Sequence, residues 1–173
     1  MPDSQSQPAI PPHASIEQRL AMNLRPDALK SEQLRRAHAD WYRLRNGPGI
    51  PDYRSFDICD FSYVVGSLNM MEVERDPWRF RYRVHSSLAV RNCGKDLTGL
   101  YLDDYPSEMH RENIKKFCVH AAQRNEPTID IAENIMLFRR RMLYETVGLP
   151  FGNPAGEITH LALAINSRPV VSL

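Results

Sequence analysis

Apolar and polar residues alternate strictly along residues 79–86, the segment RFRYRVHS. Phe80, Tyr82 and Val84 share one side of an extended chain, whereas the neighbouring arginines and His85 share the other side. This period of two predicts a β-strand with one buried face and one exposed face. We therefore expect His85 to face solvent.

Four further segments are predicted to be strands, because aliphatic and β-branched residues are concentrated in them between turn signals. The sequence RDPW separates the first of them from residues 79–86, which predicts a hairpin. The sequence GNPAG joins the last two in the same way. The four segments are residues 68–74, 128–138, 141–151 and 157–167.

A helix is predicted over residues 27–46, because apolar residues recur there at intervals of three and four. The sequence NGPG then ends this helix with a glycine followed by a proline. A helical apolar stripe needs a covering surface, and two are equally plausible: the sheet of its own chain, or the same stripe of a second copy in a homodimer. The stripe consists of Leu34, Ala37, Trp41 and Leu44.

Helices also fill the middle of the chain. The segment SLAVRN is predicted to be a short helix that ends at Gly94, and a longer helix is predicted over residues 107–124. Strand pairs on both sides of a group of helices predict an α+β fold, with one five-stranded antiparallel sheet and the helices on one face. The buried side of the longer helix is expected to comprise Met109, Ile114, Phe117, Cys118 and Ala121.

The chain length of 173 residues suits one domain with appendages. Residues 1–14 are rich in proline, serine and glutamine and are expected to be a disordered tail. Residues 15–65 are interpreted as an N-terminal helical segment with a connector, residues 66–167 as the core, and residues 168–173 as a C-terminal tail.

Charge and composition exclude several classes of protein. The net charge is +1 and the basic residues are dispersed, so we expect no nucleic-acid partner. No apolar run approaches the length needed to cross a bilayer, so we expect no membrane insertion. The 3 cysteines are widely spaced, which favours a reducing, cytoplasmic location over a disulfide framework.

Four segments in a fixed order resemble the PAS superfamily. They are AHADWYRLRNGPGIP (37–51), FRYRVHSS (80–87), GKDLTG (94–99) and YETVGLPF (144–151). The similarity is greatest to an alphaproteobacterial stand-alone PAS family, and it covers about residues 27–166. In PAS domains two strands, a group of helices and three strands build a five-stranded antiparallel sheet that cups a small cavity.

The resemblance implies a sensory or regulatory module that binds a small molecule, a partner protein, or both. It implies no universal ligand and no catalytic residue, so we expect no enzymatic turnover. Few residues follow the last predicted strand, so we expect the output to act in trans, through another protein or through the geometry of a homodimer.

If a cavity exists, the inner face of the sheet and the helices should form its walls. Strand alternation alone leaves the inward side of residues 141–151 open, so Tyr144 and Glu145 compete for it. Glu145 is a possible polar group of the pocket; the alternative, which we favour, is an exposed edge position or a structural ion pair. The expected lining residues are Tyr82, Val84, Leu88, Leu102, Phe117 and Tyr144.

Cys93 follows an asparagine, as does the photoactive cysteine of flavin-binding light sensors. Gly94 comes directly after it, however, and ends the helix that a flavin site would need to continue. Cys93 is therefore interpreted as a half-buried packing thiol, and no flavin is expected.

Histidines raise the possibility of haem, because some PAS domains hold haem through a helical histidine. His110 and His120 lie on the same predicted helix, about 80° apart around its axis, so at most one of them points squarely at a cavity. A packing role is favoured for each, and no haem is expected. No cysteine or histidine cluster has the spacing of a metal site.

Two other classes of function stay open. One is an interaction adaptor whose core is filled by side chains. The other is a small α+β enzyme with a cone-shaped cavity, which would need a convergent acid–base pair such as Glu145 and His160.

Overall fold

The computed structural model describes residues 9–45, 47–135 and 141–170 of the chain. Four α-helices, four 3₁₀ segments and five strands follow one another in these ranges. In chain order they are α1 (Ile16–Ala21), η1 (Pro26–Ala28), α2 (Glu32–Leu44), η2 (Tyr53–Ser55), η3 (Ile58–Ser67), β1 (Leu68–Glu74), β2 (Arg79–Val84), α3 (Ser87–Cys93), η4 (Leu102–Asp104), α4 (Glu108–Ala122), β3 (Thr128–Ile135), β4 (Arg141–Gly152) and β5 (Ile158–Pro169).

The five strands form one antiparallel sheet in the order β2-β1-β5-β4-β3. The hairpin β1–β2 and the three consecutive strands β3–β4–β5 meet where β1 pairs with β5, so the first and last strands of the chain lie side by side in the sheet. The α+β class and the five-stranded antiparallel sheet are confirmed. The helices α3 and α4 lie between β2 and β3 in the chain, as the PAS resemblance implies.

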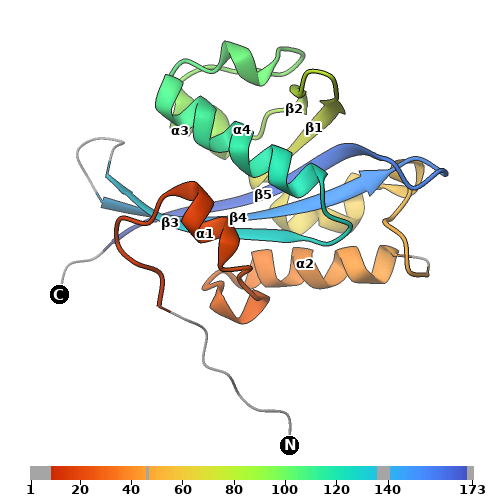
Figure 1. The fold of residues 1–173 in the computed structure, drawn as a ribbon, viewed down its shortest axis with the longest axis horizontal. Coiled ribbons are helices and arrows are strands. Elements are labelled where there is room, and N and C mark those ends of the chain that lie inside the picture. Colours follow the sequence, from red (N-terminus) through yellow and green to blue (C-terminus); the bar gives the residue numbers. More distant parts are fainter. Residues whose placement is uncertain (1–8, 46, 136–140, 171–173) are drawn as a thin grey trace, which may run out of the picture.

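Helices cover both faces of this sheet, α4 on one side and α2 on the other (Figure 1). The helices between β2 and β3 lie on one face, as expected; α1 joins them there, and α2 forms a second layer on the other face. Side chains of the sheet alternate between two separate apolar clusters, one under each layer. We call these the α2 face and the α4 face.

The apolar stripe of α2 packs on the sheet of its own chain. Leu34, Ala37 and Trp41 are at most 1% exposed and belong to the core of the α2 face. The indole Nε1 of Trp41 donates a hydrogen bond to the carbonyl oxygen of Pro150, at 2.7 Å. Because the stripe is already buried, with Leu44 packed against the same core, it cannot form the seam of a homodimer, and that alternative is wrong.

On the α4 face, Phe117 lies directly on the backbone of β4. A Cβ atom at Gly148 would come within 2.9 Å of the Phe117 ring, so the missing side chain allows the close approach of helix and strand. Three of the predicted buried residues of α4 are in the core there: Phe117, Cys118 and Ala121. Met109 lies in the first turn of α4 and is instead 51% exposed, so the expectation that it is buried is wrong.

A β-bulge corrects the predicted faces of β2. The register with β1 shifts between Met70 and Met71, so that Met70 pairs with Val84 and Met71 with Tyr82. The extra residue turns the end of the strand over. Val84 is consequently 44% exposed, and His85 is buried at 7%, so the expectation that His85 faces solvent is wrong.

The predicted ends of the domain also change. Residues 1–8 lie outside the described part of the chain, whereas Ile10, expected in the disordered tail, packs against the core of the α2 face. At the other end β5 continues to Pro169, which pairs with Met142, so the strand extends into the predicted C-terminal tail. Residues 136–138, predicted as strand, and 171–173 lie outside the described residues.

Candidate functional site

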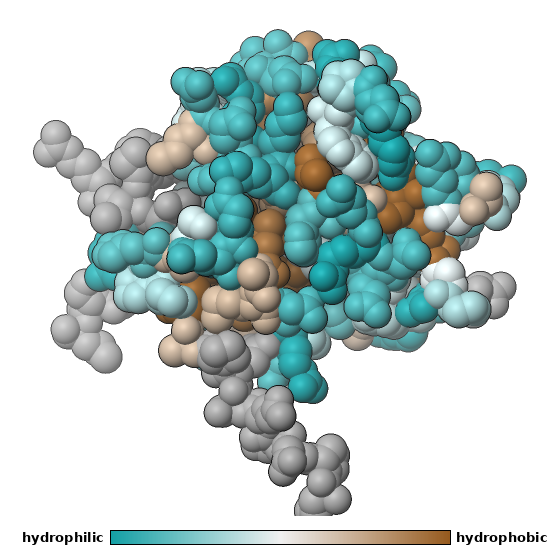
Figure 2. All heavy atoms as spheres, in the orientation of Figure 1, coloured by the Kyte–Doolittle hydropathy of each residue, from teal (hydrophilic) through white to brown (hydrophobic). Residues whose placement is uncertain are grey.

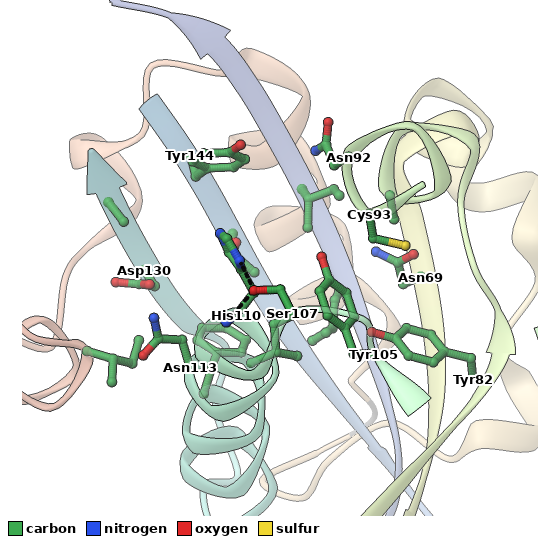
Figure 3. A pocket seen from close by; sticks show the side chains of 18 of the residues that line it. Asn69, Tyr82, Asn92, Cys93, Tyr105, Ser107, His110, Asn113, Asp130 and Tyr144 are labelled. Carbon is green, nitrogen blue, oxygen red and sulfur yellow. Dashed lines mark hydrogen bonds between the residues drawn. The ribbon is translucent and has the colours of Figure 1, made fainter. Parts of the chain in front are cut away.

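A cavity of about 390 Å³ lies between the α4 face of the sheet and the helices (Figure 3). All four outer walls are helical or irregular segments: α3, the connection before α4, α4 itself and α1. Its floor is the sheet, where Leu163 and Ile165 of β5 contribute apolar side chains. A volume in this range is typical of small-molecule sites.

Three of the six predicted lining residues face this cavity: Tyr82, Phe117 and Tyr144. Of the others, Val84 is turned away by the bulge in β2, and Leu102 is buried in the apolar cluster of the α4 face without lining the cavity. Leu88 lies on α3, but the side of α3 that lines the cavity carries Ala89, Asn92 and Cys93, which are spaced as one helical face.

Glu145 points to the opposite face from Tyr144 and is not a pocket residue. It is 0% exposed beneath the start of α2. Its Oε1 accepts hydrogen bonds from the backbone N–H groups of Lys30 and Ser31, and its Oε2 accepts one from Asn166 Nδ2 at 2.9 Å. The positive end of the α2 helix dipole also favours a carboxylate here. Glu145 therefore anchors α2 through hydrogen bonds, and it forms no ion pair with an arginine of the described residues.

The junction of β1 and α3 forms one polar side of the cavity. Asn69 is 4% exposed, and its Oδ1 accepts a hydrogen bond of 2.8 Å from the backbone N–H of Ser86. Ser86 in turn caps α3. Cys93 ends α3 beside them, half-buried, with its Sγ 2.9 Å from the carbonyl oxygen of Lys95. Gly94 adopts a left-handed conformation (φ 77°) and ends the helix as predicted.

The first turn of α4 places a histidine over the cavity. Ser107 caps the helix, and its Oγ lies 2.7 Å from Nδ1 of His110 (Figure 3). Burial lowers the pKa of His110, which favours the neutral imidazole. Of the two helical histidines, His110 lines the cavity and His120 does not.

Three tyrosines present phenol groups to the cavity. Burial raises the pKa of Tyr105 to about 12 and also raises the pKa values of Tyr82 and Tyr144. All three phenols are therefore protonated at neutral pH and serve as hydrogen-bond donors and acceptors.

An ion pair closes the side of the cavity formed by α1. Arg19 Nε lies 2.7 Å from Asp130 Oδ1, and Arg19 Nη2 lies 3.0 Å from Asp130 Oδ2. The third guanidinium nitrogen donates to the carbonyl oxygen of Ala14 at 2.7 Å. Both side chains are only 12% exposed. The pair ties α1 to β3 across a gap of more than a hundred residues in the chain, and Ile16 of α1 adds an apolar contact to the cavity wall.

The polar residues of the cavity could not be predicted from the sequence. Asn69 and Asp130 each lie between apolar residues of a strand. This alternation assigns them to one face of the strand, but it does not predict that a cavity lies over that face. Arg19 lies in a segment whose position over the cavity depends on long-range packing that local periodicity does not contain. Asn92 and Asn113 line the cavity from α3 and α4. What these sides of the helices face is known only from the tertiary structure.

Glu145 and His160, the acid–base pair named for a possible enzyme, are not brought together in the sheet. In the sheet register Glu145 pairs with Asn166, whereas His160 pairs with Phe151, and neither residue lines the cavity. The His160 ring stacks instead on Tyr53, with ring centroids 3.4 Å apart. In the described ranges no cluster of three or more histidine, cysteine or acidic residues is arranged to hold a metal ion.

The surface in the view of Figure 2 is mostly hydrophilic, with small hydrophobic areas between the elements. The large exposed apolar side chains are dispersed over α2, η3, β2, the loop after α3 and α4 rather than gathered on one element. Among the described residues, every helix is too short or too polar to cross a membrane.

No protein-family model matches the chain, and no curated protein is similar to it. Among solved structures, it is similar to a sensory box histidine kinase/response regulator from Burkholderia thailandensis E264, with 10% identity, a TM-score of 0.38, and coverage of 64% of this chain and 84% of that one.

It is also similar to an RNA-binding light-oxygen-voltage receptor, with 13% identity, a TM-score of 0.40, and coverage of 70% of this chain. The match spans 35% of the receptor chain, so about a third of that protein is compared. Both TM-scores are below 0.5, and the fold is defined by the strand order β2-β1-β5-β4-β3 of this chain's own sheet.

Proposed function

We propose that this protein is a PAS-type sensory module that binds a small molecule in the cavity of its α4 face and signals to a partner protein in trans. One observation carries the proposal: a cavity of about 390 Å³ whose walls combine apolar side chains with buried polar groups. An interaction adaptor with a filled core is favoured less, because a core built only for packing leaves few voids larger than a water molecule.

The walls of the cavity supply a route from ligand to surface. Helices α3 and α4 and the short helix α1 all contribute lining side chains, and each of these helices also has an exposed side. A ligand that changes the packing of any one of them changes the surface that a partner contacts. We further propose a cytoplasmic location, membership of the alphaproteobacterial stand-alone family and a homodimer. All three rest on the sequence, and the dimer contact must lie outside the buried α2 stripe.

Native mass spectrometry of the freshly purified protein tests the proposal, because it reports retained ligand and subunit count together. We expect the wild-type protein to carry a non-covalent small-molecule adduct, and we expect Ala132→Trp to lose it, since Ala132 lines the cavity. The variant Ala89→Phe blocks the cavity from α3 and serves as a second test if Ala132→Trp fails to fold. If the wild-type protein, like a folded blocked variant, shows only the mass of its own bare chain, the proposal is contradicted.

A further inference from the structure

The cavity has two charged side chains in its described lining, and they neutralise each other. Arg19 and Asp130 form a bidentate pair, with N–O distances of 2.7 and 3.0 Å. The remaining Arg19 nitrogen is taken by the carbonyl oxygen of Ala14. A charged ligand would have to separate this pair to find a counter-ion, which would leave a buried charge without its partner.

The cavity is also lined by one histidine and three tyrosines, and burial favours the neutral form of each. Burial lowers the pKa of His110 and raises the pKa values of Tyr82, Tyr105 and Tyr144, so these groups are neutral near pH 7. Moving an ionised ligand from water into such a site is costly, whereas a neutral polar ligand loses much less on transfer.

Asn69 supplies a directed donor. The backbone N–H of Ser86 is a donor, so the amide oxygen of Asn69 must face it, and the Asn69 NH₂ group is consequently turned the other way. The Asn69 side chain lines the cavity, the residue is 4% exposed, and its NH₂ group donates to no described residue. Asn69 Nδ2 is not among the described buried atoms that lack a partner, so this donor is open to the cavity and can bind an acceptor there. A carbonyl or ring nitrogen on the ligand would supply it.

Apolar groups complete the recognition surface. Leu163 and Ile165 lie on the sheet, Phe117 and Ile114 on α4, and Ala89 on α3. They bracket the polar groups that Figure 3 shows on both sides of the cavity: Asn69, Tyr82 and Tyr105 on one side, and Asn113 and Asp130 on the other. A flat, largely apolar ring with polar groups at its edge fits such walls.

Building on the proposed function, we infer that the ligand is an uncharged ring compound with a hydrogen-bond acceptor for the Asn69 amide. Anionic and cationic molecules of the same shape are rejected, because the Arg19–Asp130 pair leaves no net charge in the wall.

Three probes of nearly equal shape test the charge preference: indole-3-acetamide (neutral), indole-3-acetate (anionic) and tryptamine (cationic). We expect titrations of the full chain, followed by NMR shifts of the lining residues, to give the neutral probe a dissociation constant at least about tenfold lower than either charged probe. Tighter binding of a charged probe would overturn this inference and leave the proposed function intact. If none of the three probes shifts the lining residues, the inferred ligand class fails, and the native mass spectra of the wild-type protein and the blocked variants decide the proposed function.

Two variants test the residues that set the preference. Asp130→Asn leaves the Arg19 guanidinium without its anion, so indole-3-acetate should gain affinity relative to the neutral probe. Asn69→Asp keeps an oxygen for the Ser86 N–H and replaces the donor by a carboxylate oxygen, so affinity for indole-3-acetamide should fall about tenfold.

The matched control is Asn153→Asp, in which an asparagine oxygen likewise accepts backbone N–H groups, from Ala155 and Glu157, far from the cavity. It should leave the affinity unchanged. Unchanged affinity in a folded Asn69→Asp protein would remove Asn69 from the site, and an unchanged order of affinities in Asp130→Asn would show that the ion pair does not set the charge preference.

Discussion

The two faces of the sheet use buried polar groups in different ways. On the α2 face, Glu145 is fully buried, and both of its oxygens accept hydrogen bonds from the same chain. On the α4 face, Asn69 is nearly as deeply buried, but only its amide oxygen has a partner in the described residues, and its NH₂ group is turned toward a cavity. The first arrangement holds the fold together, whereas the second is available to another molecule.

Adjacent residues on one strand can therefore have different roles, one in binding and the other in stability. Tyr144 lines the cavity and Glu145 anchors α2, although they are neighbours in the sequence. The same division separates Leu163 from Ala164 on β5. Substitutions on the α2 face should accordingly change stability, and substitutions on the cavity wall should change binding.

The largest expected loss of stability follows from Trp41→Ala. The indole is 0% exposed and donates to the Pro150 carbonyl, so its removal leaves a large void and an unpaired oxygen. We expect the free energy of unfolding to fall by about 3–5 kcal/mol, measured by urea denaturation. The control is the neighbouring residue Tyr42, which is 41% exposed and whose change to alanine should cost under about 1 kcal/mol. Equal losses would show that the stripe is not core.

Glu145→Ala should be the next most destabilising change. It leaves the N–H groups of Lys30 and Ser31 without their acceptor at the start of α2, at an expected cost of about 3 kcal/mol. Glu145→Gln keeps one oxygen for these groups, and the Asn166 amide can rotate to accept from the new NH₂ group, so it should cost only about 1 kcal/mol. If glutamine costs as much as alanine, the negative charge rather than the hydrogen-bond pattern secures α2.

Acidification should destabilise the protein through its buried histidines. Burial lowers the pKa of His85 in the folded chain, although nearby Asp96 acts in the opposite direction. The unfolded chain, with a histidine pKa of about 6.5, therefore binds protons first, and stability is lost as the pH falls below that value. His85→Asn can still accept from the Leu97 N–H and does not titrate, so its unfolding free energy should depend less on pH between 7 and 5, which denaturation at a series of pH values measures. An identical slope would exclude His85 as the cause.

Tyr144→Phe should separate binding from stability. The Tyr144 hydroxyl faces the cavity and bonds to no described residue, so we expect the unfolding free energy to change by less than about 0.5 kcal/mol. Affinity for indole-3-acetamide should nevertheless change by several-fold in a calorimetric titration if the phenol contacts the ligand. A large loss of stability without an effect on binding would place Tyr144 with the structural residues.

Cys93→Ala is expected to have the smallest effect. The thiol is half-buried, and it makes one weak contact, to the Lys95 carbonyl. Affinity for the neutral probe should stay within about twofold of the wild-type value, since a cysteine in this setting is a small packing residue. Loss of binding would restore Cys93 to the list of ligand contacts.

Sequence patterning predicted the strands well because burial on a sheet repeats every second residue. It failed at β2, where one extra residue in a bulge turned Val84 outward and His85 inward. It also could not choose between Tyr144 and Glu145, because both sides of β4 are covered and both positions are buried or half-buried.

Local patterns in the sequence could not predict the cavity itself. Its walls bring α1 beside β3 and α4, an arrangement set by Ile16, Leu20 and the Arg19–Asp130 pair. Nothing in the sequence predicts that an arginine in a short helix will form an ion pair with an aspartate in a distant strand. The PAS resemblance predicted where a cavity would lie, but three of its six expected lining residues belong elsewhere.

Methyl NMR spectra recorded during a titration with indole-3-acetamide test the division between the two faces most directly. We expect the methyl signals of Leu163 and Ile165, on the cavity side, to shift as the probe is added, whereas those of Val147 and Leu149, on the α2 side, should stay in place. Shifts confined to Val147 and Leu149, or no shift on either side at saturating probe, would contradict this division.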